Sequence, residues 1–135
     1  MQFTPELRNE YHQLFTSCAV RPNRIGEVDL IIARISMNRA RYESVGNPMG
    51  IPWHFIAAIH NLESSRSFLT HLHNGDPLTG RTFHRPPGRP ASGNPPFTWE
   101  FSAADALRLK SLEHRSDRGL IAFPQPPVAA APATS

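Results

Sequence analysis

The middle of the sequence contains two carboxyl groups that could act as a catalytic pair. Glu63 and Asp76 are the only acidic residues between Glu43 and Glu100. Cleavage of a glycosidic bond needs a protonated carboxyl group near the leaving oxygen. It also needs a second group, often a carboxylate, that steadies the developing positive charge or directs a water. Glu63 and Asp76 are residue types that can fill these two roles.

The surroundings of the two carboxyl groups predict different protonation states. Glu63 follows Ile56 and Ile59 at helical spacing, so we expect it at the end of an apolar helix face, where burial would keep its carboxyl group protonated. Asp76 belongs to an Asn-Gly-Asp turn, where we expect an ionised carboxylate. The structural alternative is that Glu63 caps the helix or pairs with an arginine, and that Asp76 is only a turn residue.

A set of short runs surrounds these residues: HNLESS, THLHNGDPLTGRT, GRP, PPFTWE and SAADAL. Together they resemble a family of small lysozyme-like proteins from bacteria and their phages, over about residues 3–112. The resemblance implies a peptidoglycan muramidase that needs no cofactor, either a lysozyme or a lytic transglycosylase of endolysin type. Its substrate bond would be the β-1,4 bond between N-acetylmuramic acid and N-acetylglucosamine. By position, Glu63 matches the general acid of the broader superfamily, which includes goose-type lysozymes. Asp76 and either Thr79 or Thr82 match its second carboxylate or water-positioning hydroxyl group.

Six further residues are candidates for binding the glycan along a cleft: Trp53, His60, Ser64, His73, Asn74 and Trp99. Ser64 stands where many transglycosylases also have serine. The separation of Glu63 and Asp76 is longer than in comparable phage muramidases, and the resemblance fades after Leu112, before a second wall of the cleft is complete. The alternative is therefore a non-catalytic glycan-binding protein, or a structural component of a phage particle, with a lysozyme-like body.

The histidines near the two carboxyl groups offer a different arrangement. His60, His71, His73 and His84, together with Asp76, could hold zinc in a cell-wall hydrolase, because a His-x-His pair with a carboxylate is a known ligand set. However, the sequence has no HExxH or similar spacing of ligands on a helix. We therefore predict no metal, and keep a zinc-dependent hydrolase as an alternative.

About four helices are expected to position these residues: from Pro5 to about Ala19, from about Gly26 to Ser44, from Pro52 to about Ser65, and from Thr98 to about His114. Residues 70–97 contain ten Gly or Pro residues, and structureless segments of that length inside a compact domain are usually functional. Within this segment, residues 79–84 predict one arm of a small β-hairpin. We thus expect a mainly α, lysozyme-like domain over residues 1–121, with a cleft formed by the loop and hairpin. A flexible Pro/Ala-rich tail would follow over residues 122–135.

The apolar faces of the first two helices are expected to point into the core. They carry Leu7, Tyr11, Leu14, Phe15 and Cys18 in the first helix, and Val28, Ile31, Ile32, Ile35 and Tyr42 in the second. Cys18 is the only cysteine, which excludes an internal disulfide framework. We expect its side chain to be buried.

Charge and composition restrict the partners. The net charge is +3 with a pI of about 9.8, and a basic balance suits an anionic partner such as nucleic acid, a membrane surface or a cell-wall polymer. The arginines are scattered without a nucleic-acid-binding signature, so we expect peptidoglycan glycan strands and no nucleic acid. The start MQFTPELRNEY lacks the regions of a signal peptide, and no apolar run approaches the roughly 20 residues of a membrane span. We expect no membrane insertion. Holin-type release from the host cytoplasm, or carriage in a phage particle beside other particle proteins, would bring the protein to the cell wall.

Overall fold

The computed structural model describes residues 4–110, which form five α-helices and no β-strand. The helices are α1 (Pro5–Ser17), α2 (Ile25–Met37), α3 (Arg39–Gly46), α4 (Trp53–Ser64) and α5 (Trp99–Leu109), with short 3-10 helices η1 (Pro22–Arg24) and η2 (Asn47–Met49). The expected mainly α class is therefore confirmed. The expected tail and the continuation of the last helix to His114 lie outside the described residues. No helix between residues 4 and 110 has the length and apolar composition to cross a membrane.

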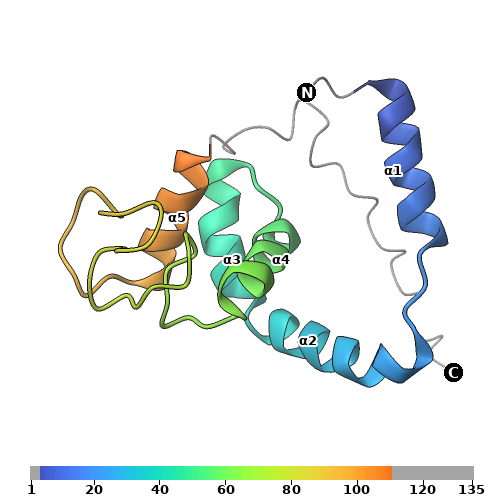
Figure 1. Ribbon diagram of the computed structural model, residues 1–135, viewed down its shortest axis with the longest axis horizontal. Helices are drawn as coiled ribbons and strands as arrows, with labels where there is room; N and C mark the ends of the chain where they lie inside the picture. Colours follow the sequence, from blue (N-terminus) through green and yellow to red (C-terminus); the bar gives the residue numbers. More distant parts are fainter. Residues whose placement is uncertain (1–3, 111–135) are drawn as a thin grey trace, which may run out of the picture.

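The core lies where α3, α4 and α5 meet (Figure 1). α3 packs against both α4 and α5, and the long loop of residues 70–97 lies beside α5. The largest buried side chains of these helices are Tyr42, Ile56, His60, Trp99 and Leu107, and the loop adds Leu72, Leu78 and Phe97. Because burial of apolar surface is the main favourable contribution to folding, this cluster fixes how α4, α5 and the loop sit together.

Two local features place α4 and α5 against the core. The hydroxyl oxygen of Thr98 accepts a hydrogen bond from the backbone N–H of Phe101 at 3.3 Å, so Thr98 is the N-cap of α5 as the sequence predicts. At the end of α3, a Cβ atom on Gly46 would lie 2.3 Å from the carbonyl oxygen of Ile51. Only glycine allows the chain to return this closely before α4 begins.

The loop does not contain the expected β-hairpin. Within the described residues, regular pairing is limited to one antiparallel bridge between Thr70 and Pro77. The backbone of Thr82 exchanges hydrogen bonds with Arg89 and Gly88 instead, at 2.8 and 2.7 Å. The prolines of this segment, at positions 77, 86, 87, 90, 95 and 96, have no backbone N–H and therefore cannot donate to a strand ladder.

The expected second helix is divided into α2 and α3 at Asn38. The side-chain amide of Asn38 donates to the carbonyl oxygen of Arg34 at 2.9 Å, while its backbone N–H bonds to the carbonyl oxygen of Ile35. A side chain that competes for backbone acceptors in this way interrupts a helix. Tyr42, after the break, is buried as expected, whereas Ile32, before it, is 53% exposed.

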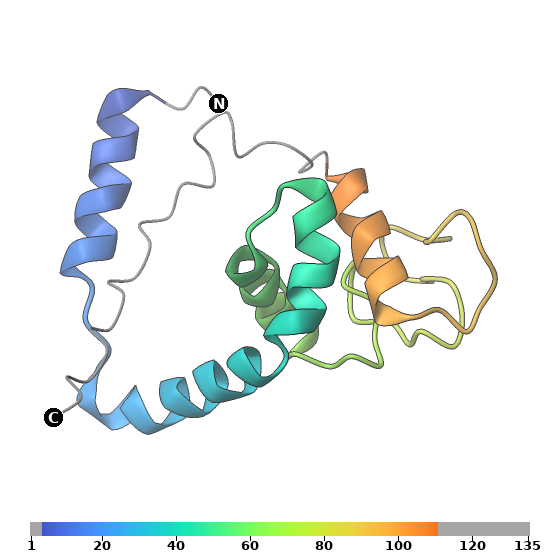
Figure 2. The same cartoon turned by 180° about the vertical axis from the view of Figure 1, so that it is seen from behind.

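α1 and α2 project away from the core, with α1 at the far end (Figures 1 and 2). Neither helix contains a buried residue. The prediction that the apolar face of the first helix is core is therefore wrong, since Tyr11, Leu14 and Phe15 are each more than half exposed. Cys18, predicted to be buried, is exposed as well. The reason is that the core formed by α3, α4 and α5 does not extend to α1 (Figure 1).

Candidate functional site

Glu63 lies in the last turn of α4, where the chain leaves the helix for the long loop. Ser65 and Arg66, directly after the helix, both have positive φ angles, 49° and 66°. Such angles are uncommon for residues with a Cβ, and they turn the chain sharply away from the helix axis. Glu63 itself is exposed, so the predicted burial of its carboxyl group is not found in the free protein.

A pocket of about 250 Å³ lies beside this turn. Its walls come from α4, from the loop and from the end of α5, and they consist of Ile59, Glu63, Leu72, His73, Pro86, Ala106, Leu107, Leu109 and Lys110. We call it the Glu63 pocket. Most of its lining is apolar, with one carboxyl group, one imidazole and one ammonium group. Its volume is below the roughly 300–1,000 Å³ of typical small-molecule sites, so it suits one part of a ligand that extends beyond it.

His73 is the buried polar wall of the Glu63 pocket. Only 1% of its side chain is exposed, and its Nε2 atom lies 2.8 Å from Oδ2 of Asp105 on α5. A carboxylate can only accept, so Nε2 carries the proton. Burial lowers the pKa of His73 below its ordinary value, although the hydrogen bond that it donates to Asp105 acts in the opposite direction. The imidazole is therefore neutral at pH 7, and its Nδ1 atom, which is buried, has no hydrogen-bond partner among the described residues.

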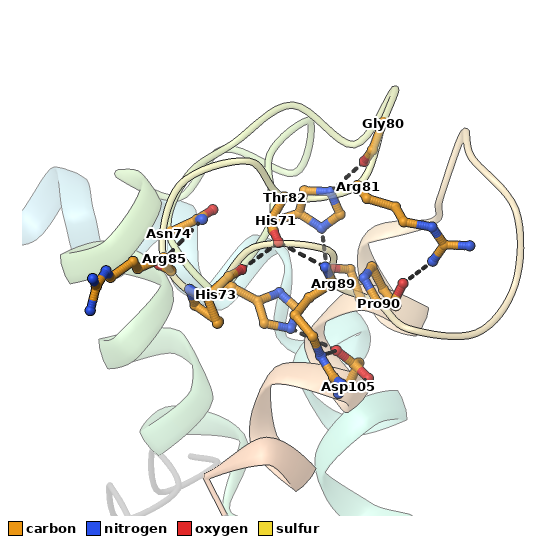
Figure 3. Close-up of polar contacts among 12 residues, drawn as sticks. His71, His73, Asn74, Gly80, Arg81, Thr82, Arg85, Arg89, Pro90 and Asp105 are labelled. Carbon is orange, nitrogen blue, oxygen red and sulfur yellow. Dashed lines mark hydrogen bonds and ion pairs between the residues drawn. The ribbon is translucent and has the colours of Figure 1, made fainter.

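Asp105 joins the loop to α5 through a second partner. The Nε and Nη2 atoms of Arg89 donate to its two carboxylate oxygens at 2.9 and 2.6 Å (Figure 3). A bidentate pair of this kind fixes orientation as well as distance. Arg89 and Asp105 were not predicted as site residues. They belong to the runs GRP and SAADAL of the resemblance, which is the one signal that could have identified them.

The carboxylate of Asp76 is hydrogen-bonded to other residues of the loop, and Asp76 does not line the Glu63 pocket. It is 4% exposed, and its Oδ2 atom accepts hydrogen bonds at 2.9 Å from the side-chain amide of Asn74 and from the backbone N–H groups of Phe83 and His84. Its Oδ1 atom lies 2.6 Å from Nδ1 of His84. Burial by itself would raise the pKa of Asp76, but these hydrogen bonds hold the pKa at about 2. The carboxylate is ionised, as expected, and both of its oxygens hydrogen-bond to groups of the loop.

The two candidate threonines also lie outside the pocket lining. Thr82 is buried, and its hydroxyl group donates to the carbonyl oxygen of Pro86 at 2.5 Å while accepting from the backbone N–H of Arg89 at 2.8 Å. Thr79 is exposed. Thr82 thus helps to fold the loop, and Thr79 stands on its surface.

Two candidates for the cleft wall, His60 and Trp99, are buried in the core at 0% and 1% exposure. The His60 ring lies 3.0 Å from the Tyr42 hydroxyl through Nδ1 and 3.0 Å from the carbonyl oxygen of Ser67 through Nε2. Burial lowers the pKa of His60, which keeps the ring neutral. Because neither side chain is exposed, neither can contact a ligand, and both belong to the core between α4 and α5.

The remaining candidates stand at different places. Trp53 is half-buried with the guanidinium of Arg39 5.0 Å above its ring. The Ser64 hydroxyl donates to the carbonyl oxygen of His60 at 3.3 Å, and Asn74 bonds to Asp76 through both atoms of its amide. Of all the residues predicted for the site, only Glu63 and His73 line the same pocket.

The residues proposed as zinc ligands do not form a cluster that could hold a metal ion. The Nδ1 and Nε2 atoms of His71 lie 2.6 Å from the Ser102 hydroxyl oxygen and 2.8 Å from the Gly80 carbonyl oxygen, so both are occupied (Figure 3). Between residues 4 and 110, no group of three or more His, Cys, Asp or Glu side chains could hold a metal ion. The loop histidines bond to neighbouring protein groups instead.

Comparison with known proteins finds no family model, no curated protein and no solved structure that matches this chain. Function is therefore inferred from the Glu63 pocket and from the motifs around it.

Proposed function

We propose that the protein is a lysozyme-like muramidase that cleaves the β-1,4 bond between N-acetylmuramic acid and N-acetylglucosamine in peptidoglycan. Glu63 is its general acid, and no cofactor takes part. The observation that carries this proposal is the place of Glu63, at the end of an apolar helix and on the wall of a pocket shared with the polar loop. The substrate class follows from the resemblance of the HNLESS and THLHNGDPLT runs.

The pocket can supply the environment that a general acid needs once a sugar is bound. Glu63 is exposed in the free protein, but Ile59, Leu72 and Leu107 make much of the pocket lining apolar. A glycan lying over the pocket expels water from these surfaces, and the lower local dielectric favours the protonated carboxyl group. The proton then passes to the glycosidic oxygen as the bond to the anomeric carbon breaks. Lys110, which also lines the pocket, suits the anionic groups of peptidoglycan.

The other predicted catalytic residues act differently in this proposal. Asp76 and Thr82 fold the loop that carries His73, through the hydrogen bonds described above. Thr79, exposed on the loop, is available for contact with the glycan. The lysozyme-like cleft would then be formed by α4, α5 and this loop. The enzyme would reach the cell wall from the host cytoplasm by holin-type release, or from a phage particle.

The test compares the wild type with Glu63→Gln on a suspension of purified peptidoglycan. We expect the wild type to reduce the turbidity and Glu63→Gln to lose at least about 100-fold of that rate, because glutamine cannot donate the proton. Glu27→Gln, on the exposed face of α2 and away from the pocket, is the matched control and should keep full activity. A Glu63→Gln protein as active as the wild type refutes the assignment of the general acid. Mass spectrometry of the products separates lysozyme, which gives reducing-end muramic acid, from transglycosylase, which gives anhydro products.

A second candidate is a non-catalytic glycan-binding protein or a component of a phage particle. The exposed apolar face of α1, with Tyr11, Leu14 and Phe15, favours it, because a face of this kind is typical of a contact with another protein. In this case the wild type would bind peptidoglycan in a sedimentation assay and release no product.

A further inference from the structure

α2 is apolar on nearly every side, yet the described part of the chain covers little of it. Its sequence IGEVDLIIARISM contains seven large apolar residues among 13. None of its residues is buried, and Ile25, Leu30, Ile32 and Met37 are each at least 47% exposed. A helix that is apolar all round normally lies inside a protein or an assembly. α2 therefore has the composition of a helix that a partner covers.

The position of α2 leaves room for such a partner. The helix projects away from the core that α3, α4, α5 and the loop form (Figures 1 and 2). Among the residues of α2, only Ile35, near its C-terminal end, packs against that core. The preceding residues 25–34 contribute nothing to it. This segment is the part of α2 that another molecule can reach.

One face of this segment has the apolar pattern of a helix–helix contact. Val28 and Ile31 are three residues apart and lie along the centre of the face, where both are half-buried. Ile25 and Ile32 are seven residues apart, so they lie two turns from each other along one edge of the same face. The four side chains together form a short coiled-coil seam.

The other edge of this face carries two charges of opposite sign. Glu27 lies near the start of α2 and Arg34 near its end, again seven residues apart and therefore in line. Glu27 forms an ion pair with Arg24 at 2.6 Å, but this pair is exposed and contributes little stability. The guanidinium of Arg34 forms no ion pair with any residue between positions 4 and 110. The edge thus has an acid at one end and an unpaired base at the other.

This pattern is complementary to itself when a second copy of α2 lies antiparallel to the first. In an antiparallel pair with a twofold axis, each edge of the seam faces the same edge of the partner. Glu27 then faces Arg34 of the second copy, and Arg34 faces Glu27 of that copy. On the other edge, Ile25 and Ile32 meet in the same way and cover each other. A parallel pair would instead place like charges together.

We propose that the protein forms a dimer with a second copy of itself through α2, in an antiparallel helix pair centred on Val28 and Ile31. The inference does not depend on the reaction proposed for Glu63, because the Glu63 pocket is formed by α4, α5 and the loop. The contact is isologous, so it closes at two copies and does not continue into a filament. Residues 25–34 span only about 15 Å of helix, so the interface is at the small end of specific interfaces and its dissociation constant is about micromolar.

The first experiment measures the mass of the full 15.1 kDa chain by sedimentation equilibrium, at concentrations from about 1 to about 300 µM. The mass of the wild type should rise toward twice this value. Ile32→Lys should raise the dissociation constant at least about 10-fold, because it brings a charge into the seam. Leu30→Lys is the matched control and should keep the wild-type constant, since positions two apart do not share a helix face. Both side chains are exposed, so neither substitution disturbs the core.

Two results of this experiment would overturn the inference. One is a wild type that keeps the mass of a single chain over the whole range, and the other is an Ile32→Lys protein that associates as tightly as the wild type. Vesicles of phosphatidylglycerol and phosphatidylcholine test the other occupant of an apolar helix. Vesicle binding by a wild type of single-chain mass would identify a membrane surface as the partner of α2 and would equally refute the dimer.

The second experiment tests the antiparallel orientation by reversing the charges. Glu27→Arg places arginines at both ends of the edge and Arg34→Glu places glutamates at both ends, so each single variant should bind its own copy about 10-fold more weakly. The double variant Glu27→Arg/Arg34→Glu restores opposite charges across an antiparallel pair, and it should recover the wild-type constant. Single variants as tight as the wild type, or a double variant as weak as the single ones, would show that this edge is not paired as proposed.

Discussion

Replacement of Asp76 by asparagine separates a structural role of this carboxylate from a chemical one. The pKa of Asp76 is about 2, against an ordinary value of 3.8. At about 1.36 kcal/mol per pKa unit, the gap corresponds to about 2 kcal/mol of stabilisation of the ionised, folded form. The neighbouring His84 side chain is 70% exposed, so solvent screens part of this interaction, and we expect about 1–2 kcal/mol.

We therefore expect Asp76→Asn to unfold more easily in urea at pH 7. With a urea dependence of about 2 kcal/mol per M, the middle of the range for a small domain, the midpoint should fall by about 0.5–1 M. Asp29→Asn, at an exposed position on α2, is the matched control and should change the free energy of unfolding by less than about 0.5 kcal/mol.

The dependence on pH has a definite sign. A carboxyl group with a lowered pKa in the folded protein stabilises it fully above the pKa of the unfolded chain, and that contribution is lost as the pH falls through the folded pKa. For Asp76 the loss occurs between about pH 4 and about pH 2. The difference in stability between wild type and Asp76→Asn should shrink over this interval. An Asp76→Asn protein as stable as the wild type, but without muramidase activity, would refute the structural role and restore Asp76 as a catalytic group.

Two further predictions concern the packing of the core and the absence of a metal. Gly46→Ala should lower the free energy of unfolding by about 2 kcal/mol or more in urea titrations, because the new Cβ would lie 2.3 Å from the carbonyl oxygen of Ile51. Gly26→Ala, where a Cβ meets nothing within 4 Å, should be neutral or stabilising. Treatment with EDTA should leave the clearing of peptidoglycan unchanged, since no metal-holding group of three side chains occurs between residues 4 and 110. Loss of clearing that zinc restores would contradict this.

The helices that carry the site could be predicted because their signals are local. Thr98 is an N-cap in sequence and in structure, and the repeat of Ile56 and Ile59 correctly placed α4 up to Ser64. Periodicity reports which face of a helix is apolar, but not whether another element covers it. The apolar face of α1 was therefore predicted as core and is largely exposed. In α2, Ile32 is exposed, whereas Val28, Ile31 and Ile35 are half-buried and Ile35 packs against the core.

The pairings within the loop could not be predicted for a physical reason. The pKa of Asp76 is lowered first by the side chain of His84 and then by the backbone N–H groups of His84 and Phe83, and every residue other than proline has such an N–H group. The contact between His73 and Asp105 joins positions 32 residues apart, with a long loop between them. No period of 2 or 3.6 residues reports a contact of that kind.

The loop shows how hydrogen bonds can fix the position of a side chain in a segment without strands. The backbone N–H of His71 bonds to the carbonyl oxygen of Asp76 at 2.7 Å, and that of Gly75 bonds to the carbonyl oxygen of His71 at 2.9 Å. His73 lies inside this closed turn, and its ring is tied to α5 through Asp105. The buried carboxylate of Asp76 and the exposed carboxyl group of Glu63 thus have separate tasks. The first keeps the turn folded, and the second stands on the pocket wall, where the proposed function places the glycan.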